Sequence, residues 1–321
     1  MTVYAYYYND PGAPSLSGTA GDLITVLDAC LVGTGGIAYG STASAGWTKS
    51  FSGTNGADYR QGTGSSLFYL DVNDNGPGAG TGKEARIKGY EAMTAYQTGT
   101  SQFPTSSQNG GLLYVRKSAS LDVVKRPWII VADQRTFYMF ILTGDTVGSW
   151  SCIAFGDIYS FRGLSDIGRC VIMGRITENS ATMTSSVELG DVLVASVGST
   201  SSGHYIARPM TGEVGSVAVG KLGSSSFSNA STVLLGTVVF PNTSSKNLFL
   251  SPVYISQSTG GNIVRGRFRG FWHFCHPLAD SSDQDTYSGT QDLNGKTFLF
   301  IKQGGNSSVY CMEISNTWEA N

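Results

Sequence analysis

Short apolar runs separated by turn-forming residues dominate this chain from about residue 66 onward. Their lengths and their spacing of about 8–12 residues are typical of antiparallel sandwiches and barrels rather than of parallel α/β sheets. The pattern predicts a mainly β protein with antiparallel sandwich-like or barrel-like sheets and one short N-terminal helix. The predicted strands are 66–72, 128–132, 136–142, 150–155, 169–176, 187–196, 204–207, 216–219, 232–240, 248–255, and a C-terminal hairpin of 297–302 with 308–314.

Helical periodicity is clearest over residues 21–32. Asp22 is the expected N-cap, and Gly33 is expected to end the helix because glycine adopts a left-handed conformation without steric cost. The apolar positions that share one helical face are Leu23, Val26, Leu27, Cys30 and Leu31. A weaker pattern predicts a second helix over Lys83–Tyr96, although Gly89 disfavours it.

Aromatic residues crowd the N-terminal segment. Tyr4, Tyr6, Tyr7 and Tyr8 lie in a stretch whose two faces are both partly apolar if it forms a strand. Such a strand needs cover on both faces, so we expect either packing within the subunit or cover from a neighbouring subunit. The chain is divided into an N-terminal arm and helix (1–36) and a β-rich body (37–321), with a weak boundary at 198–203.

Composition narrows the class of protein. Glycine, serine and threonine make up about a third of the 321 residues, whereas charged residues make up 14% and the net charge is −2. Hydrophobic residues at 40% are too many for a disordered chain, and no apolar stretch is long enough to span a bilayer. We therefore expect neither membrane insertion nor a nucleic-acid partner. The five cysteines, scattered among apolar residues, are expected to be buried free thiols of a chain that folds in a reducing cytoplasm.

Signatures of catalysis and cofactor binding are incomplete throughout. The 71–76 segment matches the start of a calcium loop, but Gly82 stands where a bidentate glutamate is required, so an Asx-rich turn is favoured. His273, Cys275 and His276 lack a fourth metal ligand, so we expect packed residues there and no metal. The sequence predicts no catalytic residues and no cofactor.

Three arginines alternate near the C-terminus, at Arg265, Arg267 and Arg269. In an extended strand they share one face and can bind carboxylates, phosphates or acidic glycans. The interpretation that we favour is an edge strand whose charges prevent aggregation or pair with a neighbouring subunit. Together with the N-terminal tyrosines, these arginines are the candidate interface residues.

Several segments resemble a family of structural proteins of tailed-bacteriophage virions. The resemblance is scattered over almost the whole chain and includes no catalytic motif. The segments that carry it are 16–24, 27–31, 46–55, 85–94, 126–133, 135–138, 155–158, 248–253 and 295–298.

The resemblance implies a virion component that is assembled in the host cytoplasm. Our first hypothesis places it at the tail tip or baseplate. Its partners would be other virion proteins and copies of itself, and it would not be an enzyme. Alternatives are a capsid decoration or collar protein, and a receptor- or glycan-binding tail protein with Trp47, Trp150, Trp272 or Trp318 as stacking platforms. We expect removal of residues 1–12 to leave a folded chain that fails to enter particles.

Overall fold

The computed structural model describes residues 1–75, 82–145, 150–176, 178, 202–223, 250–257, 263–274, 282–302, 309–315 and 317–318. Almost all of its elements are strands, and they pair antiparallel, which confirms the predicted mainly β, sandwich-like fold. The predicted strands 187–196 and 232–240 lie outside the described residues. So does most of the 198–203 boundary, and the division into domains stays a prediction.

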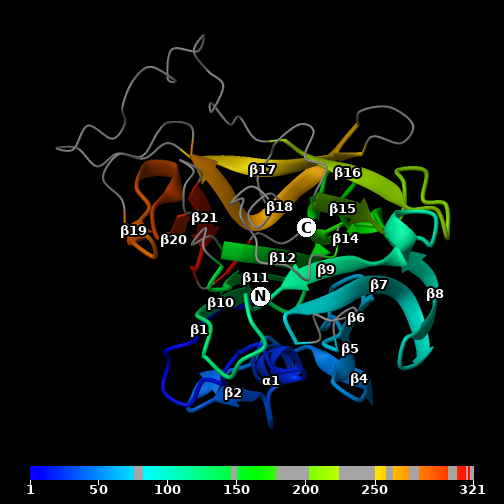
Figure 1. The fold of residues 1–321 in the computed structure, drawn as a ribbon. Coiled ribbons are helices and arrows are strands. Elements are labelled where there is room, and N and C mark those ends of the chain that lie inside the picture. Colours follow the sequence, from blue (N-terminus) through cyan, green and yellow to red (C-terminus); the bar gives the residue numbers. More distant parts are fainter. Residues whose placement is uncertain are drawn as a thin grey trace.

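A central sheet forms the middle of the molecule (Figure 1). Successive residues of its strands enter different cores, so that Ile130 packs on one side and Val131 on the other. Both faces of this sheet are therefore buried, as its nearly continuous apolar runs require. The strands are, in order of pairing, β1 (Tyr4–Tyr7), β10 (Trp128–Ala132), β11 (Thr136–Leu142), β12 (Trp150–Asp157) and β14 (Cys170–Arg175).

A second layer covers one face of the central sheet, together with the helix (Figure 1). Its strands are β4 (Thr48–Gly53), β5 (Gly56–Arg60), β6 (Tyr69–Asn73) and β7 (Glu84–Ala95), and β7 pairs further with β8 (Thr98–Phe103) and β9 (Leu113–Arg116). Tyr114 of β9 pairs with Arg175 of β14, which joins this layer to the central sheet. A small hairpin, β2 (Ile37–Tyr39) with β3 (Thr42–Ala43), forms a separate two-stranded sheet.

The third layer covers the opposite face and encloses the second core, which contains Phe271 and Met312. β16 pairs with β15 on one side and β17 on the other, and so carries the sheet over from the centre. The predicted C-terminal hairpin is confirmed as β20 with β21. β15 (Ser202–Ile206) extends the central sheet beside β14. The strands of the third layer are β13 (Tyr159–Ser160), β16 (Ala218–Gly223), β17 (Leu250–Gln257), β18 (Ile263–Phe274), β19 (Thr286–Ser288), β20 (Thr297–Lys302) and β21 (Val309–Glu313).

The predicted N-terminal helix is confirmed, as α1 (Asp22–Leu27) followed by a π-helical turn η1 (Asp28–Val32). Gly33, with φ 69°, follows its last residue as expected. The N-cap is Gly21 at φ 94° rather than Asp22. No described helix is long and apolar enough to cross a membrane. Elsewhere in the described residues the helical pieces are single 3₁₀ turns, η3 (Asn109–Gly111), η4 (Gly163–Ser165) and η6 (Gln291–Leu293).

The prediction of a second helix over Lys83–Tyr96 is wrong, because this segment is the long strand β7. β6 pairs along one edge of it, and β8 and β9 pair along the other. Gly89 fits this strand because the ring of Phe103 covers it: an added Cβ would come within 2.3 Å of that ring. Cross-strand packing overrides the weak helical period here.

Candidate interaction surface and the charges beneath it

The strand that carries the three predicted interface arginines is not an edge strand, contrary to expectation. β18 pairs with β17 along one edge and with β13 and β21 along the other. Arg265 is fully buried and its Nη2 donates to both carboxylate oxygens of Asp166, at 2.8 and 2.7 Å. Arg269 donates to Asp133 through both terminal nitrogens, Nη1 to Oδ1 at 3.0 Å and Nη2 to Oδ2 at 2.6 Å.

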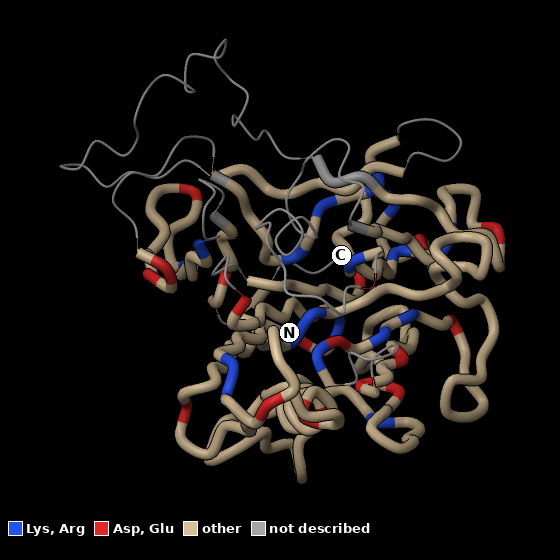
Figure 2. Tube along the Cα trace, viewed as in Figure 1, with Lys and Arg blue, Asp and Glu red and all other residues tan. Residues whose placement is uncertain are grey.

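Arg267 differs from its two neighbours because it is only partly buried. Its guanidinium lies 4.7 Å from the centre of the Tyr159 ring, in a cation–π contact. Two of the three arginines are therefore committed to ion pairs inside the chain. Figure 2 shows the wider pattern: basic and acidic positions lie together in the middle of the view.

The four N-terminal tyrosines also divide between core and surface. Tyr6 is fully buried, and its hydroxyl donates to the backbone oxygen of Ala43 at 3.0 Å. Tyr4 and Tyr7 are partly buried, and Tyr8 is 39% exposed. Core packing within the subunit thus accounts for Tyr6.

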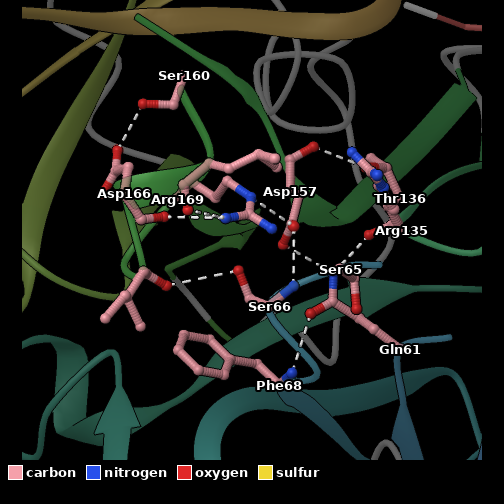
Figure 3. Close-up of polar contacts among 12 residues, drawn as sticks. Gln61, Ser65, Ser66, Phe68, Arg135, Thr136, Asp157, Ser160, Asp166 and Arg169 are labelled. Atoms are coloured by element: carbon pink, nitrogen blue, oxygen red, sulfur yellow. Dashed lines mark hydrogen bonds and ion pairs between the residues drawn. The ribbon is translucent and has the colours of Figure 1, made fainter. Parts of the chain in front are cut away.

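A buried carboxylate, Asp157 at the end of β12, joins the central sheet to the loop between β5 and β6 (Figure 3). Its Oδ2 accepts hydrogen bonds from Arg169 Nε at 2.8 Å and from the backbone amide of Ser66 at 2.9 Å. Gln61 Nε2 donates to its Oδ1 at 3.1 Å. Each hydrogen bond to a buried charge offsets part of the cost of removing it from water.

Asp166 is the second buried carboxylate of this network and sits in the loop that follows β13. It accepts a hydrogen bond from Ser160 Oγ at 2.6 Å, in addition to the pair from Arg265. Arg169 Nη1 donates to the backbone oxygens of Leu164 and Asp166, both at 3.2 Å. The loop is thus held from beneath by two arginines.

Above these buried charges, the same loop exposes large apolar side chains. Phe161, Leu164 and Ile167 are 54%, 60% and 59% exposed, and we call these three residues the apolar loop. Leu67, 38% exposed, belongs to the neighbouring β5–β6 loop, where Ser66 Oγ donates to the backbone oxygen of Ile167 at 3.5 Å. Clustered exposed apolar side chains commonly mark sites of protein–protein contact.

The tryptophans proposed as stacking platforms are mostly inaccessible. Trp47, Trp150 and Trp318 are buried, with exposed fractions of 2%, 1% and 2%. Trp272 is partly buried, and its Nε1 donates to Glu313 at 3.2 Å. The first three cannot stack on a ligand in this structure.

The turn predicted at 71–76 places two buried aspartates in different surroundings. Asp74 accepts hydrogen bonds from the backbone amides of Gly21 and Leu23 and from Lys117, so it caps α1. Asp71 lies on β6, directly opposite Asp58 of β5. A strand therefore precedes the turn, where a calcium loop would require a helix.

Asp58 and Asp71 form an acid pair with exposed fractions of 0% and 1%. Both oxygens of Asp58 and one of Asp71 have no hydrogen-bond donor among the described residues. Burial, and then the charge of Asp71, raises the pKa of Asp58 from its usual 3.8 to about 8. Burial also raises the pKa of Asp71, to about 6, although Lys88 opposes this shift. One proton shared between the two carboxyls would give Asp58 a hydrogen bond to Asp71.

The predicted packed cluster near residue 273 is only partly visible, because Cys275 and His276 lie outside the described residues. His273 pairs with Tyr310 across β18 and β21. Within the described part of the chain, no three histidine, cysteine or carboxylate side chains come together as a metal site would require. The prediction of buried free thiols is confirmed for Cys30, Cys152, Cys170 and Cys311.

Sequence reasoning missed both the apolar loop and the acid pair. The loop carried a signal, since three large apolar residues recur every third position between polar residues and belong to no predicted strand. The acid pair carried none, because only strand register brings Asp58 opposite Asp71.

No family model matches this sequence, and no curated protein is significantly similar to it.

Proposed function

We propose that this protein is a structural component of a tailed-phage virion, at the tail tip or baseplate, and that the apolar loop is one of its assembly contacts. The observation that carries the contact is the exposure of Phe161, Leu164 and Ile167 directly above buried ion pairs. The virion itself is implied by the sequence resemblance. Partners would be neighbouring virion proteins or further copies of the chain.

Rigidity beneath the loop favours this interpretation. A contact surface that is already ordered loses little conformational entropy on binding, so more of the gain from apolar burial appears as affinity. Because these side chains are already partly buried, covering the rest of one contributes about 1–2 kcal/mol. The ion pairs Asp157–Arg169 and Asp166–Arg265 anchor the loop to the body of the protein, which would restrict its conformations before a partner binds.

The glycan-binding alternative has weaker support. Three of its four stacking platforms are buried, and Trp272 is engaged with Glu313 and lies 5.5 Å from Lys296 Nζ. A polysaccharide-degrading enzyme would need two carboxylates converging in an open cleft. The acid pair Asp58–Asp71 is enclosed instead.

Incorporation into phage particles tests the proposal. Wild-type chain, supplied during infection, should co-purify with particles, whereas Leu164→Asp should remain folded and be depleted from them at least about tenfold, because a charge on the contact must be desolvated. The matched control is Ile37→Asp, which alters an exposed apolar residue on the distant hairpin β2–β3.

Either of two results would overturn it. If the wild-type chain is absent from purified particles, the protein is not a virion component. If Leu164→Asp is incorporated as well as the wild type, the protein can still be a virion component but the apolar loop is not an assembly contact.

A further inference from the structure

A buried lysine and a buried aspartate meet between the ends of two strands of the second layer. Lys117 directly follows β9 and Asp74 directly follows β6, and both side chains have an exposed fraction of 0%. Lys117 Nζ lies 2.7 Å from Asp74 Oδ2 and donates a second hydrogen bond to the backbone oxygen of Thr19 at 2.6 Å. The amine is therefore held against the carboxyl group and away from water.

The two oxygens of the Asp74 carboxyl have opposite surroundings. Oδ2 accepts the backbone amides of Gly21 at 2.7 Å and Leu23 at 3.1 Å, whereas Oδ1 is buried and has no hydrogen-bond partner among the described residues. Two amides at these distances are placed to stabilise negative charge that develops on Oδ2 during attack at the carboxyl carbon. Oδ1 is left as the oxygen that can depart.

Burial also favours the neutral amine of Lys117 and the neutral carboxyl group of Asp74, the two forms that such an attack needs. Burial lowers the pKa of Lys117, opposed by the charges of Asp74 and Asp22. Burial raises the pKa of Asp74 to about 6, opposed by Lys117. Because both charged forms are desolvated, moving a proton from the ammonium to the carboxylate costs less here than in water.

We infer that Lys117 and Asp74 form an intramolecular amide bond once the chain has folded. The ammonium passes one proton to the carboxylate, and the neutral amine then attacks the carboxyl carbon, so that the Nζ–Cγ bond forms. Oδ1 takes up two protons in total, both of them originally on Nζ, and the Cγ–Oδ1 bond breaks to release one water. No oxidant, reductant or cofactor is required.

Asp22 is a positioning residue for the turn that holds the amine. Its Oδ2 accepts a hydrogen bond from Ser17 Oγ at 2.5 Å, and Ser17 Oγ accepts one from the backbone amide of Thr19 at 3.1 Å. The backbone oxygen of Thr19 in turn accepts Lys117 Nζ, so these contacts fix the place of the amine. The resulting bond would link positions 43 residues apart and restrict the unfolded chain as a disulfide does.

Intact-mass spectrometry of the full-length purified protein, denatured just before measurement, tests the inference. The wild type should be lighter than its sequence by one water molecule, and Lys117→Met should have its full sequence mass. Tryptic digestion should then leave Lys117 uncleaved and joined to the peptide that contains Asp74. Asp22→Asn should slow the loss of water at least about tenfold after refolding, because the amine is held less firmly, without moving its site.

A natural control lies on the surface of the same protein. Lys49 Nζ is 2.8 Å from Asp28 Oδ2, almost the same contact, but these side chains are 32% and 35% exposed and should remain unlinked. Full sequence mass for the wild type, or tryptic cleavage after Lys117, would overturn the inference even if the variants do not fold. A loss of water that persists in Lys117→Met would do so as well.

Discussion

At the scale of single residues, the acid pair Asp58–Asp71 makes folding depend on pH. Both carboxyls have a higher pKa in the folded chain than the usual 3.8, Asp58 reaching about 8 and Asp71 about 6. The folded state therefore holds more protons than the unfolded state between about pH 4 and pH 8. The contribution of this pair is favourable below that window and is lost as the pH rises through it.

We expect the free energy of unfolding of the wild type to fall between pH 4 and pH 8, by up to about 1.4 kcal/mol per pH unit for each extra proton held. Asp58→Asn removes one titrating group and supplies an amide donor to Asp71. This variant should show a shallower fall and should be more stable than the wild type at pH 8. Urea denaturation across the pH range measures both; parallel curves for the two proteins would contradict the shared proton.

At the scale of elements, the loop after β13 depends on buried charges rather than on its own packing. Asp166 meets Arg265, which also donates through Nη1 to Gln257 and to the backbone oxygen of Arg208. Removing one member of a buried pair leaves the other without compensation, whereas replacing both by apolar residues removes the desolvation cost altogether.

Arg265→Met should therefore destabilise the protein by about 3–5 kcal/mol and should increase amide hydrogen exchange over residues 161–167. The double variant Arg265→Met with Asp166→Leu should recover most of the lost stability. Denaturation measured by circular dichroism gives the energies. A double variant no more stable than the single one would show that the ion pair is not the cause.

At the scale of the whole molecule, the first strand belongs to the body of the protein. β1 pairs with β10, Tyr6 is fully buried, and Val3 belongs to the second core. Thr2 also bridges to Thr317, so the two terminal regions meet. Because of these contacts, we now expect that a chain without its N-terminal segment is destabilised, contrary to the expectation from the sequence.

Deletion of residues 1–8 should lower the free energy of unfolding by at least about 3 kcal/mol, because it empties core volume and uncovers an edge of β10. Thermal unfolding and the soluble yield measure the effect. Tyr8→Ser, at an exposed position of the same segment, should change stability by no more than about 0.5 kcal/mol. If the chain without residues 1–8 unfolds at the same temperature as the wild type, this segment does not stabilise the fold and can act only in contacts between molecules.

Many of the few charged residues of the molecule form buried ion pairs. Only 14% of residues are charged, and several ion pairs are almost fully buried, among them Arg116–Asp145, Arg175–Glu84 and Arg269–Asp133. In the sequence the two members of each pair lie far apart. In the structure they connect loops and strands of different layers.

By itself the sequence determined the local features: the central strands, the C-terminal hairpin, the N-terminal helix and its end at Gly33. Each of these depends on the periodicity and turn chemistry of residues close together in the chain. Only the tertiary structure decided that Lys83–Tyr96 is a strand, that the arginine-bearing strand is paired along both edges, and that the apolar loop is exposed. Arg269 and Asp133 are 136 positions apart, and no local pattern can anticipate a partner that only folding brings within hydrogen-bond distance.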